Sequence, residues 1–328
     1  MSSDSLYGIR ATRASPPRYA LDDDERRRVY GAALAQFDEL ITAATAVGPA
    51  SLPLFYALSQ GGRAIAAAHA DSAWRLRGHG LSCQVLDAAP LDTEVKRTPV
   101  ASKDGGSVDS VTGVAGATGG QAFSEAATIG ALWASLPEIS DLLPASFDAG
   151  PLPMRFALEP DPEGVRSRID PGHVYAVAID FEGSPDELDA QLSKHYPTSI
   201  GMSAYRPFQG QPVRRVFSQY GPGLSVRWNL DAARQAGLDG IVAALARDEW
   251  CWLRPRVASV ALSSLLTWWT LLFGLSMLAR YEPAGWIQAL DYESSELAAP
   301  LARLLDIGLV RVPDLTRGAL VAVPEARN

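Results

Sequence analysis

Thiols and imidazoles are scarce in this sequence. Only Cys83 and Cys251 occur among 328 residues, and the four histidines are widely spaced. Neither cysteine has a second thiol at metal-binding spacing, and no histidine cluster is typical of a zinc site. We therefore expect both cysteines to fill small spaces in the interior, and we expect no metal or other cofactor.

Several other features are missing. The first thirteen residues, MSSDSLYGIRATR, contain no apolar segment typical of a secretion signal, which predicts a cytoplasmic protein. The formal net charge of −8 argues against a broadly basic nucleic-acid surface, and there is no DNA-binding motif. A local basic patch stays open, because arginine supplies 26 of the 29 basic residues. No hydrolase elbow, HExxH sequence or kinase set is present.

The composition is that of a globular protein, with 47% apolar and 20% charged residues. The uncharged segment Val257–Ala279 has 23 residues and could span a bilayer by length. However, serine and threonine are scattered through it, and Trp268 and Trp269 lie at its middle rather than at an interface. We predict a buried helix that packs against Leu54–Ala68, and no membrane association.

The pattern along the chain predicts an α+β protein that is mainly α-helical. Residues 1–150 form an N-terminal helical region with a central helix over 54–69, and residues 231–328 form a C-terminal helical region that completes the core. Residues 151–230, with short alternating strands between turns, predict a small inserted antiparallel sheet. Residues 1–20 are expected to form an extended arm, and residues 310–323 an edge strand.

The central helix contains an unusual glycine pair, Gly61–Gly62. Two glycines inside a helix cost roughly 1 kcal/mol each relative to alanine, so we expect another helix to approach closely there. Arg63 and His69 are six residues apart, which corresponds to about 240° around the helix, so they should lie on different faces.

The glycine-rich stretch Lys103–Gln121 suggests two alternatives. Its composition is compatible with a phosphate cradle, but Gly119–Gly120 is followed by Gln121 rather than by the lysine of a P-loop. We therefore predict a mobile surface loop.

The segments FYALSQGGRAIAAA, GHGL and LLTWWTLLFGLSMLARYEP together resemble the bacterial YaaC-like family. An arginine followed by a histidine after four to six residues is similar to the catalytic motif of HEPN ribonucleases, and the helix followed by a His-Gly turn resembles a HEPN-like helical core. This resemblance implies a HEPN-like fold, but the YaaC-like family carries no established catalytic residues.

Two sets of residues are candidates for a functional site. Arg63, His69 and His79 are the catalytic candidates, since histidine serves as a general base near neutral pH. The ligand-binding candidates are Gly78, Gly80, Arg280 and Tyr281. We expect Arg63, His79 and Arg280 to gather around a phosphate-bearing ligand, which requires the two long helices to pack parallel or to cross near their ends. The alternatives are that His79 pins a turn through its ring nitrogens and that Arg280 satisfies helix-end carbonyls.

Three functions follow from these candidates. We favour a non-catalytic protein that binds a protein partner or a ligand, with a role in stress or phage-defence regulation. The alternatives are a metal-independent HEPN-type endoribonuclease and a nucleotide-binding enzyme. Nucleotide, RNA or a second copy of the chain are the other candidate partners.

Overall fold

The computed structural model describes residues 3–47, 51–84, 89–100, 106–159, 172–205, 215–218, 221–238 and 250–321. The chain divides into two compact units, residues 1–150 with 257–328 (unit 1) and residues 151–256 (unit 2). The second unit ends at Arg256 and not at the predicted residue 230, because strand β11 (Trp250–Leu253) pairs with β6 (Met154–Leu158).

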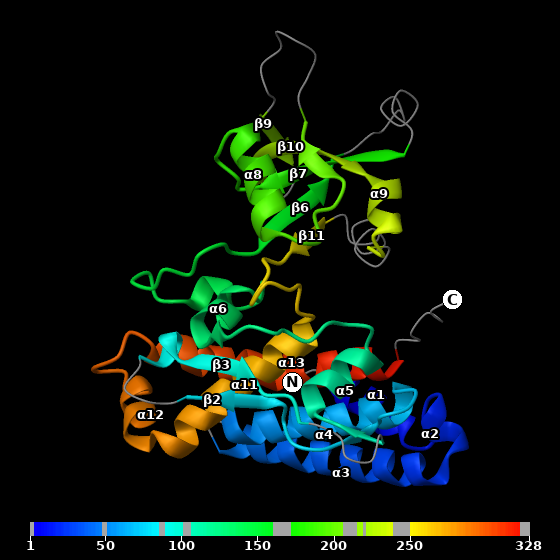
Figure 1. The fold of residues 1–328 in the computed structure, drawn as a ribbon. Coiled ribbons are helices and arrows are strands. Elements are labelled where there is room, and N and C mark those ends of the chain that lie inside the picture. The colour runs from blue at the N-terminus through cyan, green and yellow to red at the C-terminus, as the bar shows by residue number, and fades with distance from the viewer. Residues whose placement is uncertain are drawn as a thin grey trace. The chain divides into compact units, whose positions relative to one another are not determined.

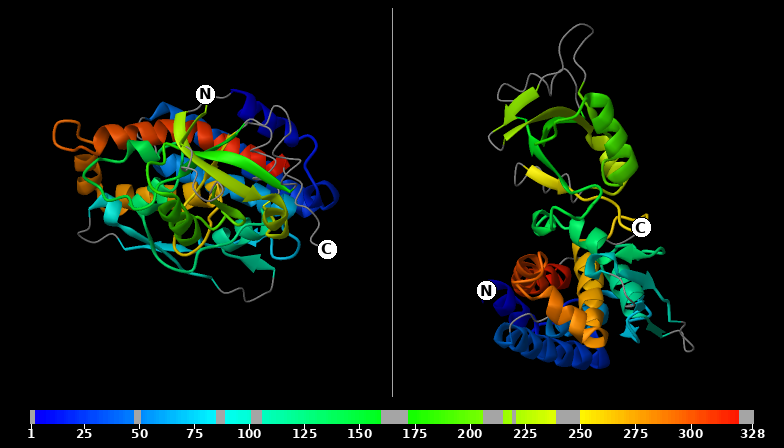
Figure 2. Two further views of the ribbon diagram at one scale, coloured as in Figure 1. Left: turned by 90° about the horizontal axis from the view of Figure 1, so that it is seen from above. Right: turned by 90° about the vertical axis from the view of Figure 1, so that its left-hand side faces the viewer.

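Unit 1 is mostly helical. Its α-helices in the described residues are α1 (Ser3–Thr12), α2 (Tyr19–Asp22), α3 (Asp24–Ala46), α4 (Ser51–His69), α5 (Ser110–Ala117), α6 (Ile129–Ala134), α11 (Ser264–Tyr281), α12 (Pro283–Ala289) and α13 (Ala298–Val321). In Figure 1, α3 and α4 lie side by side, with α11 and α13 on the other side of α4, and Figure 2 shows the same arrangement from two further directions.

Helix α4 is the centre of this unit. Thirteen of its nineteen residues are buried. A helix that is buried on most of its sides is typical of the core of a protein. A Cβ atom on Gly61 would lie 2.9 Å from Thr316 of α13, and one on Gly62 would lie 2.3 Å from the ring of Trp269 of α11. The glycine pair therefore permits the close helix approach that the sequence predicts.

Helix α11 confirms the buried helix predicted for the uncharged segment from Ser264 onward, whereas residues 257–263 are not helical. It begins at Ser264 after the N-cap Ser263, whose hydroxyl accepts from the amide of Leu266, and most of its residues are buried. Phe273 of α11 lies against Phe55 of α4, with ring centroids 5.5 Å apart. No described helix is both long enough and apolar enough to cross a membrane.

Unit 1 also contains small sheets. The strands are β1 (Arg75–Leu76), β2 (Leu81–Cys83), β3 (Glu94–Arg97), β4 (Ser107–Val108) and β5 (Ala127–Thr128), and the 3₁₀ turns are η1 (Pro90–Asp92) and η2 (Ser140–Leu142). Strands β2, β3 and β5 form an antiparallel sheet, while β1 and β4 pair in parallel. Strand β4 lies directly before α5 in the chain.

The prediction of a surface loop over 103–121 is wrong for its described central part, which forms β4 and α5. Asp109 caps α5 by accepting from the amide of Thr112, and Val111 and Val114 are fully buried. Gly113 packs against Leu76, where a Cβ would lie 2.4 Å away. Tertiary burial thus outweighs the low helix propensity of glycine, serine and threonine. Residues 101–105 lie outside the described part.

Both predictions for the chain ends need correction. The region expected to be an extended arm contains α1, in which Leu6 and Ile9 are buried. The segment after residue 310, which was expected to be an edge strand, is instead the last part of α13, which ends at Val321. Val312 and Leu320 are fully buried, so the buried face of the helix continues past Pro313. Residues 322–328 lie outside the described part.

Unit 2 contains the predicted small antiparallel sheet. Its elements are β6 (Met154–Leu158), β7 (His173–Ile179), α8 (Pro185–His195), β8 (Met202–Ala204), β9 (Arg215–Ser218), β10 (Gly221–Asn229), α9 (Leu230–Gln235) and β11 (Trp250–Leu253). The strand order is β11-β6-β7-β10-β8, with β9 also pairing with β10, and all described pairings are antiparallel. Its own core includes Phe156, Leu188 and Trp228.

We predict opposite effects of alanine at two helical glycines. Gly62→Ala should lower the free energy of unfolding by about 1–3 kcal/mol, because the new methyl group meets Trp269 and Val114. A Cβ atom on Gly31 in α3 would have no neighbour within 4 Å. Gly31→Ala should therefore raise the free energy of unfolding by up to about 1 kcal/mol. Urea unfolding measures both, and equal effects would contradict the proposed close contact.

Candidate functional site

The first site candidate is a group of three residues in unit 1, which we call the cationic site: Arg63, His79 and Arg280. His79 packs its ring against Phe55 and Phe273, at centroid distances of 5.1 and 5.7 Å. Burial lowers the pKa of His79, and the positive charges of Arg280 and Arg63 lower it further. The positive charges of both arginines therefore act on the imidazole of His79, and its neutral form is favoured.

The helix directions that produce this arrangement differ from the prediction. Residues early in α4 contact residues late in α11, as Arg280 does with the hydroxyl of Tyr56, while Gly62 lies against Trp269, eleven residues earlier in α11. The two helices therefore run in opposite senses. The cationic site still forms, because the chain after α4 turns back and places His79 beside Phe55.

The turn that carries His79 is held by its backbone. Gly78 and Gly80 have φ values of +65° and +73°, a region that glycine adopts without strain. The carbonyl of Gly78 accepts from the amide and hydroxyl of Ser110, and that of Gly80 accepts from Arg97 at 2.9 Å. The two glycines thus shape the turn, and their carbonyl oxygens are occupied by protein donors.

The ring nitrogens of His79 make no hydrogen bond to another described residue. The alternative that His79 pins the turn through both nitrogens is therefore wrong for the described part of the chain. Its ring instead packs against the two phenylalanines.

A buried ion pair contacts the turn that carries His79 at Gly80. Arg97 and Asp109 lie 3.1 Å apart, with side chains 9% and 3% exposed. Asp109 also caps α5, and a Cβ on Gly80 would lie 2.2 Å from its carboxylate. Sequence reasoning missed this pair, although Asp109 directly precedes a helical segment in the position of an N-cap.

The two arginines of the cationic site are exposed. Arg63 forms no hydrogen bond or ion pair with another residue in the described ranges, including the acids Glu282, Asp291 and Glu293. Arg280 donates to the hydroxyls of Tyr56 at 3.4 Å and Tyr281 at 3.1 Å, and its guanidinium lies 5.0 Å from the centre of the Tyr281 ring. Neither arginine is thus neutralised by a described carboxylate.

His69 does not belong to this site. It is 5% exposed, and its Nε2 lies 2.9 Å from the carbonyl oxygen of Leu320 in α13, so Nε2 carries the proton and donates it. Burial lowers its pKa. Arg63 is exposed on another face of α4, as the helical wheel predicts, so the structure does not bring Arg63 and His69 together.

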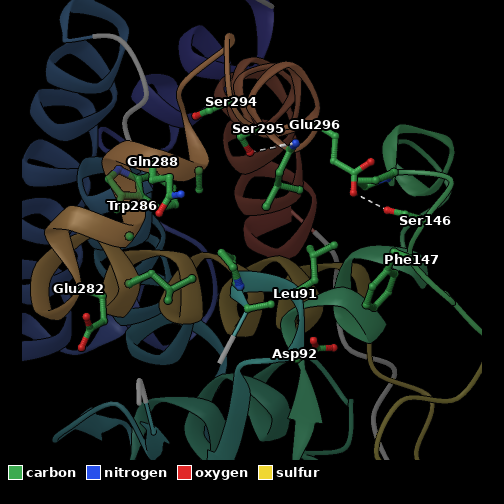
Figure 3. Close-up of a pocket in the computed structure, with 17 residues that line it drawn as sticks. Leu91, Asp92, Ser146, Phe147, Glu282, Trp286, Gln288, Ser294, Ser295 and Glu296 are labelled. Atoms are coloured by element: carbon green, nitrogen blue, oxygen red, sulfur yellow. Dashed lines mark hydrogen bonds between the residues drawn. The ribbon is translucent and has the colours of Figure 1, made fainter. Parts of the chain in front are cut away.

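A second candidate is a cavity of about 660 Å³ at the C-terminal end of α11, the end that also carries Arg280 (Figure 3). Its apolar wall includes Leu91, Phe147, Leu278, Trp286 and Leu297. Three carboxylates, those of Asp92, Glu282 and Glu296, also line it, and none of its described lining residues is basic. Sequence reasoning missed this cavity, because its walls come from separate segments of the chain.

No group of three or more histidine, cysteine or acidic side chains in the described ranges is arranged to hold a metal ion. Cys251 is buried and Cys83 partly buried, and burial raises their pKa values to about 12 and about 11, so both thiols stay protonated at neutral pH.

Taken together, these features are those of a mainly helical α+β protein in which Arg63 and Arg280 are exposed and His69 is buried. A family model described as YaaC-like Protein matches residues 17–320. The chain belongs to this YaaC-like family. No curated protein and no solved structure gives a significant match.

We predict that Arg280 controls the ionisation of His79. Arg280→Gln removes a nearby positive charge, so the pKa of His79 should rise toward its ordinary value while burial still keeps it below. NMR titration of the imidazole protons measures this. Arg303→Gln, an exposed arginine of α13, is the control and should leave the pKa unchanged. An unchanged pKa in Arg280→Gln would separate Arg280 from the site.

We also predict that the Arg97–Asp109 pair stabilises the fold. Asp109→Ala leaves a buried guanidinium without its carboxylate and should cost about 3–5 kcal/mol of unfolding free energy. Asp38→Ala breaks an exposed pair with Arg10 and should cost less than about 1 kcal/mol. If chemical denaturation gives similar values for the two variants, the pair does not support the turn.

Proposed function

We propose that this protein is a non-catalytic binding protein whose cationic site takes a phosphate-bearing ligand. The observation that supports this most is the pair of exposed guanidinium groups, Arg63 and Arg280, that have no described carboxylate partner. A guanidinium offers several donors in a plane that fits phosphate oxygens, and such charged hydrogen bonds are stronger than neutral ones. Because the net charge of the chain is −8, this local cationic site is distinctive.

The neighbouring aromatic residues favour a ligand with a ring as well as a phosphate. Tyr281 is exposed and Tyr56 is partly exposed, and the hydroxyls of both accept hydrogen bonds from Arg280. Exposed tyrosines beside arginines are typical of sites that stack a base and hold its phosphate. A nucleotide or a short single-stranded RNA is therefore the ligand class that we propose.

Catalysis is the second candidate, and it rests on the neutral imidazole of His79. A neutral histidine can accept a proton from a 2′-hydroxyl, and an arginine can stabilise the charge that develops on phosphorus. Cleavage also requires a group that protonates the leaving oxygen. His69, the other predicted catalytic histidine, is buried and hydrogen-bonded to Leu320. We therefore favour binding over cleavage.

The glycine-rich stretch offers less support for a nucleotide-binding enzyme. Its described part is a helix whose first turn is already capped by Asp109, a carboxylate that would repel a phosphate. A role in stress or phage-defence regulation, with a protein partner or a second copy of the chain, is the cellular setting that we propose from the HEPN-like resemblance alone.

We predict that each site arginine contributes to affinity. Arg63→Gln and Arg280→Gln should each weaken binding of ATP or of a labelled single-stranded RNA by about tenfold, since each loses a charged hydrogen bond. Arg303→Gln removes the same charge elsewhere and should not. Fluorescence polarisation or calorimetry measures the affinity. Undetectable binding by the unaltered protein, or an equal loss in Arg303→Gln, would contradict the proposal.

RNA cleavage in the presence of a chelator separates the two candidate functions. We expect no cleavage by the unaltered protein, and we expect His79→Gln to retain RNA binding. If the unaltered protein cleaves RNA, and His79→Gln abolishes cleavage without lowering the melting temperature, the protein is a ribonuclease and the binding-only proposal fails.

A further inference from the structure

The cavity at the end of α11 is large enough to hold a small molecule. Its volume of about 660 Å³ lies within the range of small-molecule sites, about 300–1,000 Å³. Five separate segments of unit 1 form its walls: residues 89–92, residues 144–147, the end of α11, helix α12 and residues 294–297. A ligand in this cavity would thus contact the last turn of α11 and the segment that directly precedes α13.

The walls combine two kinds of surface. In the view of Figure 3, Trp286 and Phe147 lie on opposite sides of the cavity, with Leu91 between them. Trp286 is largely buried, and Phe147 is fixed by close packing on Gly130, where a Cβ would lie 2.1 Å from its ring. These side chains provide an apolar, partly aromatic lining whose shape is set by the fold.

The charge of the cavity has one sign. Asp92, Glu282 and Glu296 line it, and its described lining residues include no lysine, arginine or histidine. Ser146 donates a hydrogen bond to Glu296, so this carboxylate is held beside the cavity, as the dashed line in Figure 3 marks. Such a lining repels anions and favours a cation, which an aromatic ring also attracts.

We propose that this cavity binds a small organic cation, namely an amine attached to an aromatic or aliphatic body. The body would displace water from the apolar wall, and the ammonium group would face the carboxylates. This ligand class is opposite in charge to that of the cationic site, so the proposal does not depend on the proposed function. The two sites also use different residues of the same helix end, Leu278 and Glu282 here but Arg280 and Tyr281 there.

Three probes of the same size test the charge preference. They are 2-phenylethylamine, 2-phenylethanol and phenylacetate, which are cationic, neutral and anionic at pH 7. In saturation-transfer NMR and calorimetry, we expect the amine to bind at least about fivefold more tightly than the alcohol. We expect no binding of phenylacetate. Added salt should weaken only the amine. Equal binding of all three probes, or no binding of the amine, would overturn the proposal.

Paired variants locate the binding. The double variant Glu282→Gln with Glu296→Gln should weaken amine binding by about fivefold or more. The matched double variant Glu39→Gln with Glu293→Gln removes two exposed carboxylates that do not line the cavity, and it should bind as the unaltered protein does. Equal losses in both double variants would show that the amine senses only the overall charge of the protein, and the proposal would fail.

A variant that fills the cavity tests the location of the bound amine independently. Gly285 lines the cavity, and a Cβ built on it would have no neighbour closer than Glu282 at 4.0 Å, so Gly285→Leu should fold and fill the space. Gly116→Leu, at a glycine of α5 with no neighbour within 4 Å, is the control. Gly285→Leu should abolish amine binding with an unchanged melting temperature. Retained binding in this variant would place the amine elsewhere.

Discussion

The close approach of α4 to α11 and α13 at Gly61 and Gly62 is the constraint on which unit 1 depends. Two glycines without side chains let the ring of Trp269 and the side chain of Thr316 lie against the α4 backbone. This contact places Phe273 against Phe55, and those two rings in turn hold His79. The position of the cationic site therefore depends on helix packing as well as on the turn that carries His79.

The return of the chain after α4 completes the site. Because α4 and α11 run in opposite senses, the segment after α4 must travel back along the helix for His79 to reach Arg280. Its turn is fixed at Gly78 and Gly80 by hydrogen bonds from Ser110 and Arg97. Buried groups, among them Arg97 and Asp109, hold this turn, while Arg63 and Arg280 are exposed.

Local sequence rules predict some of these features and miss others for physical reasons. Gly61–Gly62 indicated a close helix contact, and the helical wheel separated Arg63 from His69, because both depend only on the geometry of one helix. The relative direction of α4 and α11 depends on contacts between distant segments, so the predicted parallel packing was wrong. Helix α5 was missed because burial of Val111 and Val114 outweighs weak propensity. The cavity beside Trp286 was missed because it is assembled from five segments.

The central claim is that the exposed guanidinium groups of Arg63 and Arg280 hold a phosphate beside His79. A crystal structure of the protein with ATP tests this most directly. The account predicts phosphate density within hydrogen-bonding distance of both guanidinium groups, with the adenine ring against Tyr56 or Tyr281. Phosphate density at any other place on the molecule, with Arg63 and Arg280 exposed to solvent as before, would contradict it.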